Sequence, residues 1–300
     1  MATLHLFVAD LAFAAVTAAV LGLATVAFSL QYAVSNVLNL AFGELLTVAA
    51  YFAYAGSRYG HLPVWIAGLA AIVLVGVLSI GLNHFIVAPF SRRSTSAFTP
   101  MIVTFAISAV LEHLVVAVFG PNSFSLPLGS TSTALRVGDF ALSFNALATI
   151  AMAVLAMVLL QVILKRTLFG KAMRAIVDNR SLARACGIRA TLITDLAWFI
   201  SGCLAGIAGL ALLVSTGTGN SLLGTNFLLF IIPAAFLGGM GSMYGAMLGA
   251  VVIAFAGDWS SILFGSEYKV VVGLVVLLLI FFLRPAGIVP MPERKWEGGG

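Results

Sequence analysis

Long apolar runs separated by short polar interruptions fill most of this chain. They occupy about residues 7–28, 32–55, 64–87, 101–119, 144–164, 193–216 and 270–283. Uninterrupted apolar runs of about 18 or more residues predict transmembrane helices. A β-barrel would instead need short segments that alternate between apolar and polar residues. We therefore predict an all-α polytopic membrane protein.

Two apolar segments are interrupted in ways that predict broken helices. Residues 220–257 leave room for two crossings or a hairpin of shorter helices, with a break at Gly238–Gly241. The second run contains Asn36, Asn39 and Glu44. We expect about eight to nine membrane-embedded helices, some broken or re-entrant, and the breaks near Asn39 and Gly241 are candidate counterparts in two halves of the chain.

Composition agrees with a membrane location. The 300 residues are 62% hydrophobic and 8% charged, with a mean hydropathy of +1.14, whereas soluble domains carry about 25% charged residues. Cys186 lies in a polar loop and Cys203 in an apolar run, which indicates neither a disulfide nor a metal site. The first ten residues have no basic segment, so the first run is expected to be a span rather than a signal peptide. A single transmembrane domain over residues 1–300 is expected.

Positive charge is concentrated in the loop at residues 165–192. Its basic residues, opposed by Asp178 alone, are Lys165, Arg166, Lys171, Arg174, Arg180, Arg184 and Arg189. Basic loops face the cytoplasm. Arg92–Arg93 and Arg294–Lys295 fall on the same side if residues 220–257 cross twice. This predicts an N-terminus outside and a C-terminus in the cytoplasm, and we read the net charge of +5 as topology rather than nucleic-acid binding.

The basic loop also has the sequence of a short capped helix. Asp178 or Asn179 suits the N-cap, residues 180–186 favour a helix, and Gly187 suits the position after its end. Two interpretations stay open from these residues alone. The segment is either a solvated loop that only sets orientation, or a helix that docks on a partner protein.

No catalytic motif is present. The chain lacks HExxH, GxSxG, paired metal-ligand spacing and a dinucleotide fingerprint. Gly170–Lys171 does not complete a Walker A motif, because Lys165 stands where that motif needs glycine. We therefore predict a non-catalytic chain that binds no metal or cofactor and does not hydrolyse ATP by itself.

Ionisable residues within apolar runs are the remaining candidates for function, because burying them in a membrane is costly. Glu44 is expected to contact a substrate ammonium group, to hold a proton, or to cap or cross-link helices. Glu112 and His113 form a second polar pair. Together with Asp258 these residues leave open an ion-coupled secondary transporter.

Small residues recur at helical spacing in two places. Rows of this kind allow helix backbones to approach closely in lipid. We assign helix packing to them, with lining of a translocation path as the alternative. The glycines concerned are Gly202, Gly206, Gly209, Gly241, Gly245 and Gly249.

Five stretches in order resemble one transporter family over nearly the whole chain. They are NVLNLAFGELLTVAAY (36–51), GKAMRAIVDNRSLARACGIRATLI (170–193), AGIAG (205–209), LGGMGSMYGAMLGA (237–250) and SEYKVVVGLVVLLLIFFLRPAGI (266–288). The set is similar to the permease subunits of high-affinity branched-chain amino acid ABC importers, whose relatives carry urea or short amides. Phe42 replaces the family's His and Ala49 its Gly. These departures lie in membrane segments, so both substrate classes stay open.

The resemblance implies a multi-pass subunit in a bacterial or archaeal cytoplasmic (inner) membrane. Its implied partners are a second homologous permease in a heterodimer, two cytoplasmic ABC ATPases that bind ATP and Mg, and an extracytoplasmic substrate-binding protein. Our candidates for the translocation path are Asn36, Asn39 and Glu44. The residues implied to couple the chain to an ATPase are Arg174, Ala175, Asp178, Asn179, Ala183, Gly187 and Ile188.

Overall fold

The computed structural model describes residues 2–93, 96, 98–125, 133–137, 140–265, 268–283 and 287–289. Arg294 and Lys295 of the expected cytoplasmic tail lie outside them. The helices are α1 (Ala2–Ser35), α2 (Phe42–Arg58), α3 (Val64–Gly81), a π-helical turn η1 (Leu82–Val87), α4 (Ala88–Arg93), α5 (Phe98–Phe119), α6 (Phe144–Arg166), α7 (Leu168–Asp178), α8 (Arg180–Ala185), α9 (Ala190–Thr216), α10 (Leu223–Gly238), α11 (Met243–Phe264) and α12 (Lys269–Leu283).

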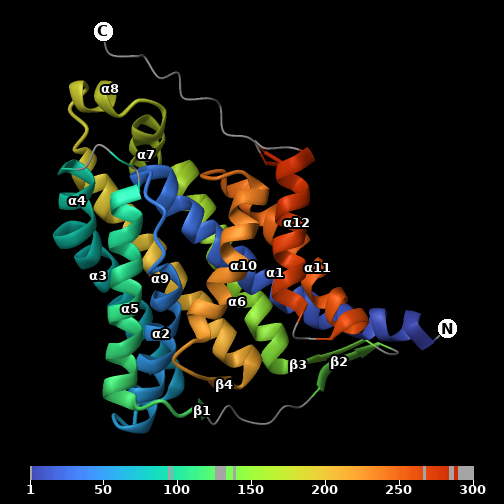
Figure 1. The fold of residues 1–300 in the computed structure, drawn as a ribbon. Helices are drawn as coiled ribbons and strands as arrows, with labels where there is room; N and C mark the ends of the chain where they lie inside the picture. Colours follow the sequence, from blue (N-terminus) through green and yellow to red (C-terminus); the bar gives the residue numbers. More distant parts are fainter. Residues whose placement is uncertain are drawn as a thin grey trace.

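The predicted all-α membrane architecture is confirmed. Within the described ranges, six helices are long and apolar enough to cross a bilayer. They start at Leu11, Val64, Phe98, Phe144, Ala190 and Met243. The shorter α2, α10 and α12 lie among these helices in Figure 1.

Two helix boundaries differ from the sequence-based expectation. The second apolar run was expected to start near Tyr32, but α1 continues to Ser35 and α2 begins only at Phe42. The expected loop at residues 88–99 is partly helical, because η1 carries the chain from α3 directly into α4. Hydropathy marks where a chain is apolar, and it does not mark where an apolar helix breaks.

The helices pack as two halves that contact each other through α1, α2, α9 and α10. In one half α1 packs against α11, and in the other α9 packs against α3. The short helices α2 and α10 meet at their N-termini, where the main chains of Gly43 and Gly224 are in direct contact. The break before α2, residues 36–41, therefore lies next to the segment that precedes α10, and the expected correspondence with the segment around Gly241 stays a prediction.

Short strands occur in segments that were expected to be irregular. Strand β1 (Phe124–Ser125) pairs antiparallel with β4 (Thr218–Gly219), and β2 (Thr133–Val137) pairs with β3 (Phe140–Ser143). In Figure 1 the strands lie at the end of the molecule opposite α7 and α8. The β1–β4 pair joins the segments that follow α5 and α9 at that end.

Close backbone contacts hold α9 in the centre of the core. A side chain on Gly202 or Gly206 would collide with α3, and one on Gly209 with the Leu46 carbonyl of α2. Gly245 and Gly249 contact α10 in the same way, whereas Gly241 precedes α11 in a turn with φ of 83°. In lipid, where apolar burial does not drive helix association, such contacts supply the packing energy.

Candidate functional site

The basic loop folds as two helices at one end of the molecule (Figure 1). Thr167 separates α6 from α7, and its hydroxyl accepts a hydrogen bond from the Gly170 amide at 3.2 Å. Arg174 donates to the Leu164 carbonyl at 2.6 Å, which ties α7 to the end of α6. The sequence analysis missed α7, although its buried Met173 and Ile176 lie three residues apart on one face.

The short capped helix in this loop is present as α8. Asn179, rather than Asp178, is its N-cap and accepts from the Leu182 amide at 2.9 Å. Gly187 follows its end with φ of 84°, and the Ile188 amide donates to the Ala183 carbonyl at 3.0 Å. Local capping therefore defines both ends of the helix.

The residues assigned to coupling differ in their exposure. Arg174, Asp178, Asn179 and Gly187 are exposed, whereas Ala175 and Ile188 are partly buried. Ala183 is only 4% exposed and packs against the membrane helices. Leu182, which is 61% exposed on α8, was not among the residues assigned to coupling.

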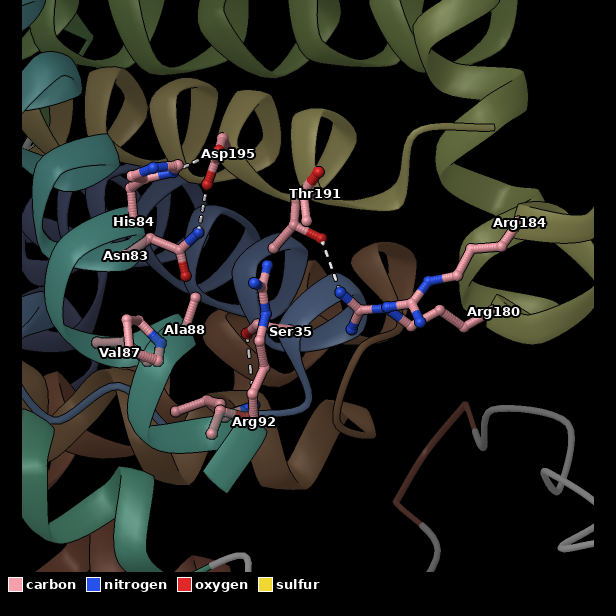
Figure 2. A pocket seen from close by; sticks show the side chains of 14 residues that line it. Ser35, Asn83, His84, Val87, Ala88, Arg92, Arg180, Arg184, Thr191 and Asp195 are labelled. Carbon is pink, nitrogen blue, oxygen red and sulfur yellow. Dashed lines mark hydrogen bonds and ion pairs between the residues drawn. The ribbon is translucent and has the colours of Figure 1, made fainter. Parts of the chain in front are cut away.

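Polar side chains from α1, η1, α4, α8 and α9 line a cavity of about 280 Å³ (Figure 2). Asp195 of α9 accepts from Asn83 Nδ2 at 2.7 Å through Oδ1, and its Oδ2 lies 3.1 Å from His84 Nδ1. Arg180 of α8 donates to Thr194 Oγ1 at 3.4 Å. These contacts connect α8, α9 and η1, and Asp195 is a second residue that the sequence analysis missed.

Glu44 lies fully buried where α2, α5 and α10 meet. Its Oε1 accepts from the hydroxyls of Thr225 on α10 and Ser108 on α5. Next to it, Thr47 Oγ1 accepts from the Gly224 amide at 2.9 Å. Both Glu44 and Thr225 belong to the first turns of their helices, where the helix dipole favours a negative charge.

The other two candidates for the path have local contacts. Asn39 is buried, accepts from the Ala41 amide at 3.0 Å and donates to Gln31 Oε1 at 3.2 Å, so it shapes the break before α2. Asn36 is exposed and has φ of 55°, a left-handed conformation that asparagine tolerates.

The remaining ionisable residues are dispersed. Asp258 of α11 forms an ion pair with Lys269 of α12. His113 of α5 is exposed, and its Nδ1 lies 2.8 Å from the Ala109 carbonyl of the same helix. Glu112 lies on α5 one turn after Ser108. No group of three or more metal-ligating side chains was found in the described part of the chain.

Comparisons with known proteins agree over most of the chain. Residues 11–281 match the family described as branched-chain amino acid transport system / permease component. The chain is 26% identical to the high-affinity branched-chain amino acid transport system permease protein LivH of Escherichia coli K12, with 90% of this chain and 91% of the relative covered. It is 24% identical to BraD of Pseudomonas aeruginosa, a permease protein of the same description, with 90% and 92% covered.

An archaeal relative and one solved structure extend this comparison. The probable branched-chain amino acid transport permease protein LivH of Methanocaldococcus jannaschii is 28% identical, with 89% of this chain and 87% of the relative covered. PsaBC from Streptococcus pneumoniae in complex with Fab is 16% identical, with 91% of each chain covered and a TM-score of 0.50. At that identity the structural likeness concerns the fold alone.

Proposed function

The chain belongs to the family of branched-chain amino acid transport permease components, and we propose that it is the membrane-spanning subunit of an ATP-binding-cassette importer for branched-chain amino acids. The relatives with this function are covered over about nine tenths of their length. Urea or short amides are the less favoured cargo. An ion-coupled secondary transporter is also less favoured. Such a transporter needs ionisable residues along one path, whereas Asp258 pairs with Lys269 and Glu44 bonds separately to Thr225.

We propose that the end bearing α7 and α8 faces the cytoplasm. Basic loops face the cytoplasm, and positive charge is concentrated in the loop at residues 165–192 and at Arg92–Arg93 of α4. The N-terminus would then lie outside and the C-terminus in the cytoplasm, with about eight to nine embedded helices in a single domain of residues 1–300. The helices α2 and α10, with 17 and 16 residues, are shorter than a full span and support a count that includes broken segments.

The coupling role of α8 is the central part of this proposal, and exposed Leu182 is the observation that carries it. Leu182 is 61% exposed, so it does not pack in the core of this chain. It suits the apolar groove of a partner ATPase, with Asp178, Asn179 and Gly187 around it. Ala183 would instead anchor α8 to the membrane helices.

Side-chain hydrogen bonds connect α8 to the membrane helices, so a movement of α8 would be transmitted to them. Arg180 bonds to Thr194 at the start of α9, and Asp195 bonds to Asn83 after α3. Further along α9, Ser201 donates to the Ala27 carbonyl of α1 at 2.9 Å. Partner ATPases that bind ATP and Mg would therefore displace α9, α3 and α1 together when they close.

Glu44 is the strongest of the three proposed path residues. It lies between the two halves, so relative movement of the halves would open its surroundings. Its Oε2 has no hydrogen-bond donor among the described residues and could accept one from a substrate ammonium group. Asn36 and Asn39 would contribute by holding the break before α2. A second homologous permease and an extracytoplasmic binding protein would complete the pathway.

The coupling assignment can be tested with Leu182→Asp in the complex reconstituted with its ATPases. We expect ATPase binding to weaken by about tenfold or more, because a charge would enter an apolar interface. ATP-driven amino acid uptake should fall in parallel. The matched control is Leu168→Asp, which places the same charge on an 81% exposed leucine of α7. Equal binding and uptake by the two variants would exclude α8 as the docking element.

A further inference from the structure

The cavity in Figure 2 is lined by basic side chains from two helices. Arg92 reaches into it from α4, and Arg180 and Arg184 enter from α8 on the other side. His84 of η1 also lines it. The hydroxyls of Ser35, Ser91, Thr191 and Thr194 complete its polar surface.

The acidic residue of the cavity is bonded to side chains other than Arg92 and Arg184. Both oxygens of Asp195 are engaged, Oδ1 by Asn83 and Oδ2 by His84. Asp195 is bonded to Asn83 and His84 and Asp258 pairs with Lys269, so neither carboxylate pairs with Arg92 or Arg184. An excess of positive charge around a hydroxyl-lined hollow is the composition of a phosphate site.

The surroundings of the cavity indicate where such a phosphate comes from. Phe85, whose ring contacts that of His84 at a centroid distance of 5.2 Å, is 78% exposed. Phe90 on α4 is 48% exposed. A phenylalanine ring exposed on a membrane-embedded helix is apolar throughout, so it suits contact with lipid acyl chains. The cavity therefore opens beside a surface that suits acyl chains.

We propose that this cavity binds the headgroup phosphate of an anionic phospholipid in the cytoplasmic leaflet. Basic pockets between membrane helices on that side are suited to such headgroups. The lipid phosphate would lie between Arg92 and Arg184, with its acyl chains along α4. A cavity of about 280 Å³ holds a phosphate and part of its glycerol.

The proposal deepens the proposed function, since it rests on the cytoplasmic placement of α8. A phosphate bound by Arg92 and Arg184 would brace the coupling helix against α4. Anionic lipid would then be a structural part of the route from the ATPase to α3 and α9. Without a bound phosphate, the like-charged guanidinium groups of Arg92 and Arg184 would face one cavity with no anion between them.

The test is lipid binding by the full chain in neutral detergent. Binding of phosphatidylglycerol, phosphatidylcholine and inorganic phosphate is measured by native mass spectrometry and by the thermal shift of the chain. We expect phosphatidylglycerol to bind in preference to phosphatidylcholine, and Arg92→Gln and Arg184→Gln each to weaken its binding by about fivefold. Lys171→Gln is the control, because it removes one exposed positive charge on the same side but outside the cavity.

Each result decides the proposal separately from the transport function. Weaker phosphatidylglycerol binding in both arginine variants but not in Lys171→Gln supports it. Equal loss in all three variants would show a diffuse surface charge and overturn it. Binding of inorganic phosphate without preference for phosphatidylglycerol would overturn the lipid assignment. None of these measurements needs the ATPases, so a failure here leaves the coupling role of α8 untouched.

Discussion

The contact between Gly43 and Gly224 gives a sharp test of the two-half arrangement. A Cβ atom on Gly224 would lie 1.8 Å from the Gly43 carbonyl oxygen, whereas ordinary van der Waals contact begins near 3.4 Å. Gly224→Ala must therefore push α2 and α10 apart by about 1.6 Å. The 2.9 Å bond from the Gly224 amide to Thr47 would then exceed hydrogen-bonding distance.

The free energy of unfolding should fall by about 2–4 kcal/mol in Gly224→Ala. Overpacking contributes about 1–3 kcal/mol, and the hydrogen bonds of Thr47 and Thr225 add about 0.6 kcal/mol each in a membrane protein. The control is Gly81→Ala on α3, where an added Cβ meets no atom within 4 Å. A helical alanine there should be neutral or stabilising by about 0.5–1 kcal/mol.

The measurement is reversible unfolding in mixed micelles with increasing denaturing detergent, followed by tryptophan fluorescence. Trp198 is fully buried and reports loss of the core. Gly43→Ala should destabilise by a similar amount, and the double variant by less than the sum, because the two glycines share one contact. If Gly224→Ala were as stable as Gly81→Ala, the close approach of α2 and α10 would be refuted.

Two further predictions concern buried polar groups. Glu44→Gln should reduce amino acid uptake at least tenfold while the yield of the complex stays normal. The reason is that the glutamine amide oxygen still accepts hydrogen bonds from the neighbouring hydroxyls but carries no charge. Glu112→Gln is the control, and normal uptake with a poor yield of the complex would instead indicate a purely structural role for Glu44. Ser201→Ala should destabilise the chain by about 0.6 kcal/mol through loss of its bond to Ala27, measured in the same unfolding assay. Ser215→Ala on the same helix should lower the free energy of unfolding by less, because the Ser215 hydroxyl bonds only to the preceding turn of its own helix. Equal losses in the two variants would contradict the prediction.

Features that depend on residues close together in the sequence were predictable from the sequence. The apolar runs gave most spans to within a few residues, because lipid demands continuous apolar helices. Asn179 and Gly187 marked α8, since a cap needs only the amides and carbonyls of adjacent turns. The basic loop was likewise visible as charge.

The contacts that join the parts were decided by the tertiary structure. The long spanning helices of this chain are apolar on nearly all sides, so no polar stripe indicates which face packs inward. The strand pair β1–β4 brings Phe124 opposite Gly219, and Asp195 reaches Asn83, across long separations that no local pattern encodes. The break before α2 was visible in the sequence, but its meeting with α10 at Gly224 was not.

The sequence by itself determined that this chain is a membrane protein and which of its loops is basic. It also determined where the short helix α8 starts and ends. These properties follow from hydropathy, charge and capping, which act over a few residues. Only the tertiary structure placed Glu44 between two helix N-termini and gathered Arg92 and Arg184 at one cavity. Such groupings depend on which helices pack together, and in lipid that choice is made by close backbone contacts between distant glycines.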